Sequence, residues 1–266
     1  MSLRLLPLAG LIVMLAAPAR AADLAPPGGY TDTYDWSGFY VGINGGFGWQ
    51  DSSIDFSYTG SIPTYFSQPV GFLPASINNS ASGAQAGLQI GFNVQSGSLM
   101  YGLEADGVAF TGKGSGSFTA SDTLYTDFGQ SISATTTTQT PWVGSLRARL
   151  GFTDDRFLGY VTGGLAVGRT QTQATMSYFA DSIFWTPPSL YTWSTSRSST
   201  SIGWAAGAGI EYAFASNVIA RIEYMYYNLG NTSSTMADTS FSGFAGGVQR
   251  TNSLSTIRIG LGYKFP

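Results

Sequence analysis

The chain has 266 residues, of which 10% are charged, 43% are hydrophobic and 35 are glycines, with neither cysteine nor histidine. An ordinary soluble domain has about 25% charged residues, so this composition does not fit a protein whose whole surface faces water. The lack of Cys and His excludes disulfide scaffolds, zinc clusters and imidazole-based catalysis from this chain. The formal charge of -3 provides no basic field for binding nucleic acid.

Residues 1–21 predict a secretory signal peptide. A positive charge precedes the apolar stretch Leu5–Ala17, and the small-residue motif Ala19-Arg20-Ala21 follows it. A membrane-spanning helix is the alternative, but the apolar stretch is shorter than the ~20 residues that cross a bilayer. We therefore expect export, with cleavage between Ala21 and Ala22.

After a linker rich in Pro and Gly at residues 22–35, the predicted barrel domain occupies residues 36–266 and consists of period-two segments. Apolar side chains alternate in them with glycine, polar or charged residues, as in strands whose two faces meet different surroundings. Most of these segments approach the roughly 9–11 residues that a tilted strand needs to cross a bilayer. The eight segments are residues 39–49, 84–95, 99–106, 142–152, 157–168, 203–212, 220–226 and 256–265.

Short and long connections alternate between these segments. The short ones are turns at Gly97-Ser98, at Asp154-Asp155 and around Ser216. The long ones, rich in Ser, Thr, Asn and Pro, are Gln50–Ser82, Thr111–Thr140, Arg169–Thr200 and Leu229–Asn252. Because this layout is typical of outer-membrane barrels, we predict an all-β fold. Its form would be an eight-stranded antiparallel transmembrane up-and-down β-barrel with short periplasmic turns and four long extracellular loops.

A soluble barrel of the lipocalin type has the same alternation with its apolar face inside. Separate arguments are therefore needed to decide whether the apolar face points outward or inward in this chain. The segments contain a single lysine, Lys264, whereas a face in water usually carries many. Glycines gather on the polar face and leave room for Arg and Glu inside a narrow barrel. Aromatic residues gather on the apolar face near segment ends, as membrane girdles do: Trp49, Trp142, Trp204, Tyr101, Tyr212, Tyr224, Tyr226, Tyr263 and Phe265.

The polar face would then carry a balanced set of charges into the lumen. A hairpin that turns about Ser216 places Glu211 opposite Arg221, and opposite charges stabilise such a pair. This charge network is either a selectivity ring or proton path, or an ion-pair core that plugs the lumen. We favour the plug because side chains just fill an eight-stranded barrel. Its members are Glu104, Asp106, Arg147, Arg149, Glu211, Arg221, Glu223 and Arg258.

Three segments, residues 36–42, 142–151 and 258–265, together resemble the small outer-membrane β-barrel family of alphaproteobacteria. This family includes major outer-membrane and immunogenic surface proteins, often labelled porin-family. The resemblance implies a surface structural role that links envelope integrity, host contact and, in some members, hemin binding.

The end of the chain also resembles the signal that the outer-membrane assembly machinery reads, an apolar residue at every second position up to a terminal aromatic. The chain departs from this pattern because Pro266 follows the last aromatic residue. The residues that fit the signal are Ile257, Ile259, Leu261, Tyr263 and Phe265.

We expect a non-enzymatic outer-membrane protein that supports envelope integrity and presents surface loops for host or ligand contact. Aromatic clusters in the predicted loops are either a binding platform or side chains that pack on one another and on lipid. Expected partners are outer-membrane lipid and lipopolysaccharide, the assembly machinery, and host surface molecules or hemin, but not nucleic acid. The clusters are Phe56, Tyr58, Tyr65 and Phe66; Phe179, Phe184, Trp185, Tyr191 and Trp193; and Phe241 and Phe244.

Two other functions stay open, a narrow porin-like passive channel and a hemin-binding surface protein. Without histidine, an iron ligand would have to be a tyrosine such as Tyr65, Tyr178 or Tyr191. An enzyme is the least expected class, because the paired loop carboxylates Asp51 and Asp55 lie in polar sequence and have no histidine to assist them. We expect no cofactor and no metal.

Overall fold

The computed structural model describes residues 33–59, 75–125, 128–180, 189–237 and 245–266. These residues belong to the structural unit Thr33–Pro266. The predicted signal peptide, the cleavage site at Ala21 and Ala22, and most of the predicted linker lie outside the described residues. Within the described ranges, no helix is long and apolar enough to cross a membrane.

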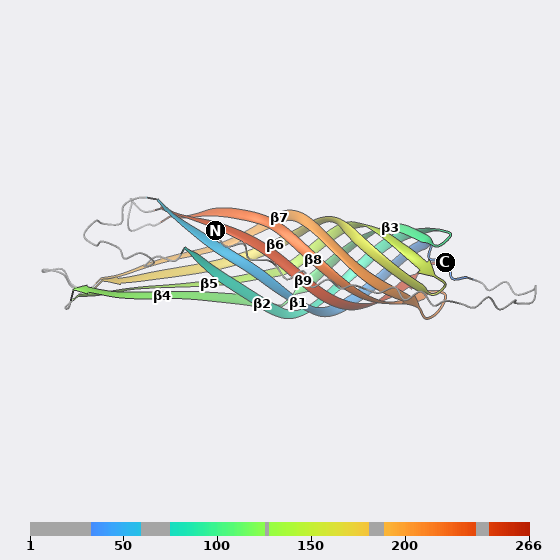
Figure 1. Ribbon diagram of the computed structural model, residues 1–266, viewed down its shortest axis with the longest axis horizontal. Coiled ribbons are helices and arrows are strands. Elements are labelled where there is room, and N and C mark those ends of the chain that lie inside the picture. Colours follow the sequence, from blue (N-terminus) through green and yellow to red (C-terminus); the bar gives the residue numbers. More distant parts are fainter. Residues whose placement is uncertain (1–32, 60–74, 126–127, 181–188, 238–244) are drawn as a thin grey trace, which may run out of the picture. The chain divides into compact units, whose positions relative to one another are not determined.

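The unit is built from antiparallel strands that form a closed ring (Figure 1). Consecutive strands pair with one another, β1 pairs with β9, and β3 pairs with β5, so the sheet returns to its start. The predicted all-β antiparallel class is confirmed. The strands are β1 (Gly38–Thr59), β2 (Ser76–Ser96), β3 (Leu99–Phe110), β4 (Lys113–Tyr125), β5 (Phe128–Asp154), β6 (Phe157–Ala180), β7 (Ser189–Ala213), β8 (Val218–Ala237) and β9 (Ala245–Lys264).

The described residues contain nine strands, where the sequence predicts eight. The additional strand is β4, which lies inside the predicted loop Thr111–Thr140. Both β3 and β4 pair with the long strand β5, β3 along Trp142–Phe152 and β4 along its preceding half, Phe128–Gln139. β3 and β4 thus occupy successive levels beside β5, separated at residues 111–112.

The predicted long loops are a second difference, because much of each is strand. β6 and β7 pair from the predicted loop start Arg169↔Thr200 up to Ala180↔Ser189. We call these parts of the strands the extension: residues 50–59, 76–82, 113–125, 128–140, 170–180, 189–200, 230–237 and 245–254. Runs of Thr and Ser carry few apolar residues, so they resemble loops in a hydrophobicity pattern, although Thr is a good strand former.

Below the extension, large apolar side chains project outward from the ring and polar ones project inward. Leu88 is 68% exposed, Ile259 is 65% exposed and Leu165 is 63% exposed. Aromatic rings meet at both margins of this apolar belt, as in the pairs Phe39–Phe92 (4.6 Å between centroids) and Trp204–Tyr226 (5.3 Å). This arrangement is the reverse of a soluble barrel, and it agrees with the direction of the faces that the sequence predicts.

In the extension the distribution of apolar and polar side chains between the two faces changes. An apolar cluster of Ile77, Ile132, Ala134 and Met176 is buried on the inner face, beside buried polar side chains such as Asn79 and Thr136. On the outer face the exposed side chains are mostly polar, such as Ser133 and Thr175, although Phe179 and Leu190 are exposed there as well. The ring therefore has an apolar outer face along its belt and a water-compatible outer face along the extension.

Backbone irregularities mark the level at which the pattern changes. The β5–β6 ladder shifts register between Gln139 and Trp142, on either side of Pro141, which has no N–H to contribute. The β8–β9 ladder shifts between Asn228 and Asn231, where Gly230 has a φ of 72°. In β5 the shift changes which residues face inward, from even-numbered ones such as Ile132 and Ala134 to odd-numbered ones such as Arg147 and Arg149.

Because the outer face changes from apolar in the belt to polar in the extension, a lysine should affect stability differently at two positions of β5. Leu146 lies in the belt and is 56% exposed, whereas Ser133 is exposed in the extension. A lysine on the lipid face near mid-membrane costs about 2–4 kcal/mol, whereas a lysine in water costs little. We expect Leu146→Lys to lower the free energy of unfolding from lipid vesicles by that amount, and Ser133→Lys to leave it unchanged. Equal losses in urea titrations of the two variants would contradict the assignment of the faces.

Candidate functional site

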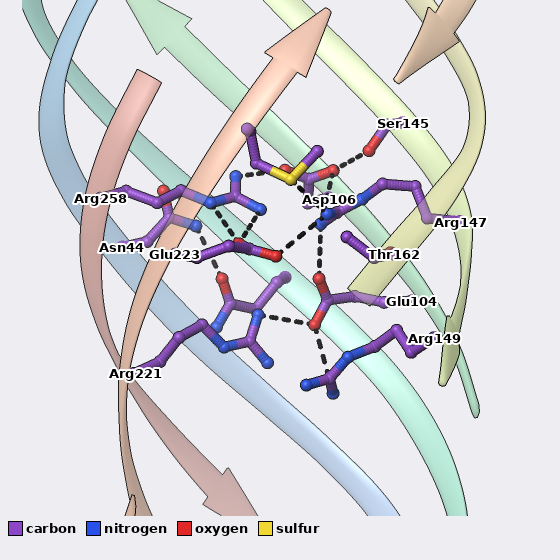
Figure 2. A network of polar contacts seen from close by, with 12 residues as sticks. Asn44, Glu104, Asp106, Ser145, Arg147, Arg149, Thr162, Arg221, Glu223 and Arg258 are labelled. Carbon is purple, nitrogen blue, oxygen red and sulfur yellow. Dashed lines mark hydrogen bonds and ion pairs between the residues drawn. The ribbon is translucent and has the colours of Figure 1, made fainter. Parts of the chain in front are cut away.

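The site is the cluster of charged side chains that fills the interior of the ring below the extension (Figure 2). β3, β5, β7, β8 and β9 supply them, because on each strand every second residue points inward. All eight side chains that the sequence analysis assigns to the charge network are buried, and none of these residues is more than 8% exposed. They are Glu104, Asp106, Arg147, Arg149, Glu211, Arg221, Glu223 and Arg258, four acids and four arginines.

Strand register brings opposite charges together. Glu211 on β7 lies directly opposite Arg221 on β8, which is the pair that the turn about Ser216 predicts. Glu104 on β3 lies opposite Arg147 on β5, and Glu223 on β8 lies opposite Arg258 on β9. Three ladders, β3–β5, β7–β8 and β8–β9, thus each contribute an acid–arginine pair on the inner face.

Glu104 is the central acid of the cluster. One carboxylate oxygen, Oε1, lies 2.5 Å from Arg147 Nη2, and the other, Oε2, lies 2.6 Å from Arg221 Nη1. Arg149 approaches Oε2 at 3.8 Å and forms a shorter pair, 2.5 Å, with Glu211 Oε1. Since Glu211 also pairs with Arg221 at 2.6 Å, these side chains form one connected half of the network.

The other half is built around Arg258. Its guanidinium lies 2.5 Å from Asp106 Oδ2 through Nη1 and 2.6 Å from Glu223 Oε2 through Nη2. Arg147 joins the halves, because its Nη1 lies 3.1 Å from Glu223 Oε1 while its Nη2 contacts Glu104 (Figure 2). The network has no net formal charge, so burial leaves no charge without a partner of opposite sign.

Tyrosines complete the network, and the sequence reasoning did not include them in the site. The Tyr40 hydroxyl donates to Glu104 Oε2 at 2.6 Å and accepts from Arg149 Nη1 at 2.6 Å. The Tyr227 hydroxyl donates to Asp106 Oδ2 at 3.3 Å, and the Tyr160 ring lies 4.0 Å from the Arg149 guanidinium carbon. Their sequence signal was available, because Tyr40 and Tyr160 share the inner face of their strands with Gly and Thr rather than with the apolar residues.

Apolar layers close the interior on both sides of the charges. The inward side chains of β8 run in the order Ile219, Arg221, Glu223, Met225 and Tyr227. Ile219 belongs to a buried cluster with Trp36, Met100 and Leu158 on one side, while Met225 and Tyr227 belong to another with Phe110, Val143 and Leu254. Since protein interiors pack without voids the size of water, such layers oppose the passage of ions.

The segment before β1 covers the end of the ring that carries the short turns. Trp36 is fully buried, and its indole N–H donates to the Asp155 carbonyl at 3.0 Å. The Trp36 backbone N–H donates to Gln95 Oε1 at 2.8 Å, and Lys264 Nζ donates to the carbonyls of Asp35 and Ser37. Burial raises the pKa of the Tyr34 phenol to about 12, so this side chain is neutral at physiological pH.

The remaining sequence-predicted residues lie apart from the network. The proposed assembly residues Ile257, Ile259, Leu261, Tyr263 and Phe265 project outward and are 43% to 65% exposed. Asp51 and Asp55 are exposed on β1. Of the tyrosines considered as iron ligands, Tyr178 and Tyr191 are paired across β6 and β7, and the Tyr178 hydroxyl donates to Gln130 Oε1 at 3.1 Å. Tyr65 lies outside the described residues.

The acids of the network are engaged by arginines. Glu104 and Glu223 each pair with two arginines, so both oxygens of each carboxylate have a partner. Among the residues that the structure describes, no three acidic side chains converge in a way that would hold a metal ion. The arrangement is suited to joining five strands across the interior of the ring.

Comparison with known proteins gives a consistent result. Residues 9–265 match the family described as outer membrane protein beta-barrel domain. The chain is 32% identical to a 31 kDa outer-membrane immunogenic protein of Brucella melitensis, over 97% of this chain and 98% of that one. It is 27% identical to a 25 kDa outer-membrane immunogenic protein of Brucella abortus, over 87% of this chain and 80% of that one. Among solved structures, the outer membrane protein OprG of Pseudomonas aeruginosa matches 88% of this chain and 98% of its own, with 17% identity and a TM-score of 0.48.

Pairwise removal of charge tests whether the network is a balanced unit. Glu211→Ala deprives Arg149 and Arg221 of a shared carboxylate, and Arg221→Ala leaves Glu211 with one arginine. Each single variant should lose about 3–5 kcal/mol of unfolding free energy, because a buried charge loses its partner. The double variant keeps the charges balanced, so we expect it to lose clearly less than the sum of the single losses. Additive losses in urea unfolding from vesicles would show that the two residues act independently.

Proposed function

The chain belongs to the outer membrane protein β-barrel domain family and is an integral protein of the outer membrane, and from this premise we propose that it is a sealed, non-enzymatic scaffold. In this role it supports the integrity of the envelope and presents its extension outside the cell for contact with host molecules or ligands. The observation that carries the proposal is the filled interior: a neutral ion-pair network between two apolar layers.

The proposed topology is a transmembrane barrel whose wall has eight positions, with β3 and β4 sharing one of them. The short turns would lie in the periplasm and the extension outside the cell, as is usual for such barrels. The belt supports this placement, because the exposed residues of β1 from Phe39 to Trp49 span about the 9–11 residues of a tilted transmembrane strand.

The network and its apolar layers support a mechanical role rather than transport. Nine ion pairs connect five strands across the interior, and removal of a single partner leaves a buried charge uncompensated. Trp36 covers the turn end of the ring with hydrogen bonds to Gln95 near the end of β2 and to Asp155 in the turn between β5 and β6. A barrel whose strands are connected by ion pairs in its interior resists deformation, and this role does not require an open lumen.

The extension supports a role in contact at the cell surface. Its outer face carries mostly polar side chains, with Phe179 and Leu190 exposed as well, and a buried apolar cluster packs within it. Outer-membrane lipid and lipopolysaccharide are the proposed surroundings, and the assembly machinery is the proposed partner for the outward residues at the end of β9. A hemin ligand remains an alternative partner for this surface, and of the tyrosines considered for it Tyr178 has its hydroxyl engaged by Gln130.

Conductance distinguishes the sealed scaffold from a channel. In planar bilayers we expect no steady conductance from the wild type, since both apolar layers and the charge network occupy the lumen. The combined substitution of Trp36, Glu104, Arg147 and Tyr227 by Ala, which removes side chains from both apolar layers and from the network, should introduce measurable conductance, whereas Ser133→Ala in the extension should not. A stable, ion-selective current from the wild type would overturn the proposal in favour of a passive pore.

Removal of the β6–β7 extension tests the contact function. Arg169 and Thr200 are partners across β6 and β7, so a short turn joining them replaces residues 170–199 without disturbing the belt. The shortened protein should keep heat-modifiable migration on gels and lose binding to host cells or matrix. Undiminished binding by the shortened, folded protein would place the contact surface elsewhere.

A further inference from the structure

Strand β7 has one paired edge and one open edge in the extension. β6 pairs with it along its whole length, up to Ala180↔Ser189. On its other side, the ladder with β8 ends at Trp204↔Asn228. Among the described residues, no strand pairs with this second edge along residues 189–200.

A bulge in β8 causes the separation. The register of β8 shifts between Asn228 and Asn231, and Gly230 adopts a φ of 72° that favours glycine. The Gly230 N–H donates to Asn228 Oδ1 at 2.9 Å, which fixes the bend. Beyond this bulge β8 continues to pair with β9 and no longer with β7.

The open edge lacks the features that usually protect an edge strand. Exposed edges in natural proteins carry charges, prolines or bulges that prevent another strand from adding to them. Residues 189–200 contain no proline and one charged residue, Arg197, and their ladder with β6 has no register shift. The edge is regular and long enough to accept a further strand.

We propose that this edge of β7 binds an extended, acidic polypeptide segment by β-strand addition. Unpaired backbone N–H and C=O groups along one edge are matched by the backbone of another strand. Acidic character follows from the charges: Arg197, exposed on β7, is the only charged residue among residues 189–203, and β6 beside it contains no acid along residues 157–180. The inference rests on the proposed contact function of the extension and names the class of partner.

A second copy of the chain in the same membrane does not fit this edge. Two barrels related by an axis along the membrane normal would present β7 strands that both run toward the periplasm. Each strand tilts by about 35–45°, so the two would cross at about 80° and could not form a ladder. A flexible partner segment can instead align with β7 along its length.

The chain contains no cysteine, so cross-linking at single introduced cysteines tests the proposal. The full protein in lipid nanodiscs would carry Ser196→Cys on β7 or, as the matched control, Thr175→Cys on β6. Both side chains are exposed, but Thr175 lies on a strand that is paired on both edges, with Thr135 and Ser194. The probe is a short peptide of alternating Val and Thr that carries Glu residues and a single Cys.

We expect disulfide capture of the probe to be at least about tenfold greater at position 196 than at position 175. A probe with proline at alternate positions, which cannot complete a ladder, should not be captured, and Arg197→Ser should reduce capture of the acidic probe. Only protein with heat-modifiable migration is counted, so misfolded variants do not contribute. Equal capture at both positions, or equal capture of the proline probe, would overturn the inference. If the probe is not captured selectively at position 196 but deletion of residues 170–199 still abolishes host contact, only the inference about β7 fails and the proposed function stands.

Discussion

In this closed ring the inward side chains of each strand contact other side chains rather than bulk water, so every inward charge needs a partner within the ring. The rest of the structure follows from that constraint. Four arginines and four acids lie on that face below the extension, and each finds its opposite charge on a neighbouring strand or across the interior. A buried charge without a partner is very costly, so the register of several ladders is linked through these pairs. The outer face is thereby free to be uniformly apolar, as a lipid environment requires.

The same constraint explains the extension. Above the aromatic residues Trp49, Trp142 and Trp204 the outer face is mostly polar, so water rather than lipid is the matching solvent. The inner face there gains an apolar cluster of Ile77, Ile132 and Met176. Bulges at Gln139–Trp142 and Asn228–Asn231 accompany this change, and beyond the bulge in β8 no strand among the described residues pairs with the second edge of β7.

The sequence was most informative where its alternation was apolar against polar. The belt segments, the three short turns, the pairing of Glu211 with Arg221 and the proximity of Glu104 to Arg147 could all be predicted. The strands of the extension could not, because Thr lies on both of their faces, as with buried Thr136 and exposed Thr135 in β5, and this gives little contrast in hydrophobicity. Tyr40 and Tyr160 were placed on the correct face, but their role depends on distances across the ring, which a pattern along one strand does not contain.

The central claim is that lipid surrounds the belt and water surrounds the extension of one continuous set of strands. Single cysteines placed along the outer face of β5 and labelled with a fluorophore would measure this directly in vesicles whose acyl chains carry bromine quenchers. The account predicts strong quenching at Leu146 and Leu150 and none at Ser133 and Thr135. Quenching that is equal along the strand, or confined to Ser133 and Thr135, would contradict it.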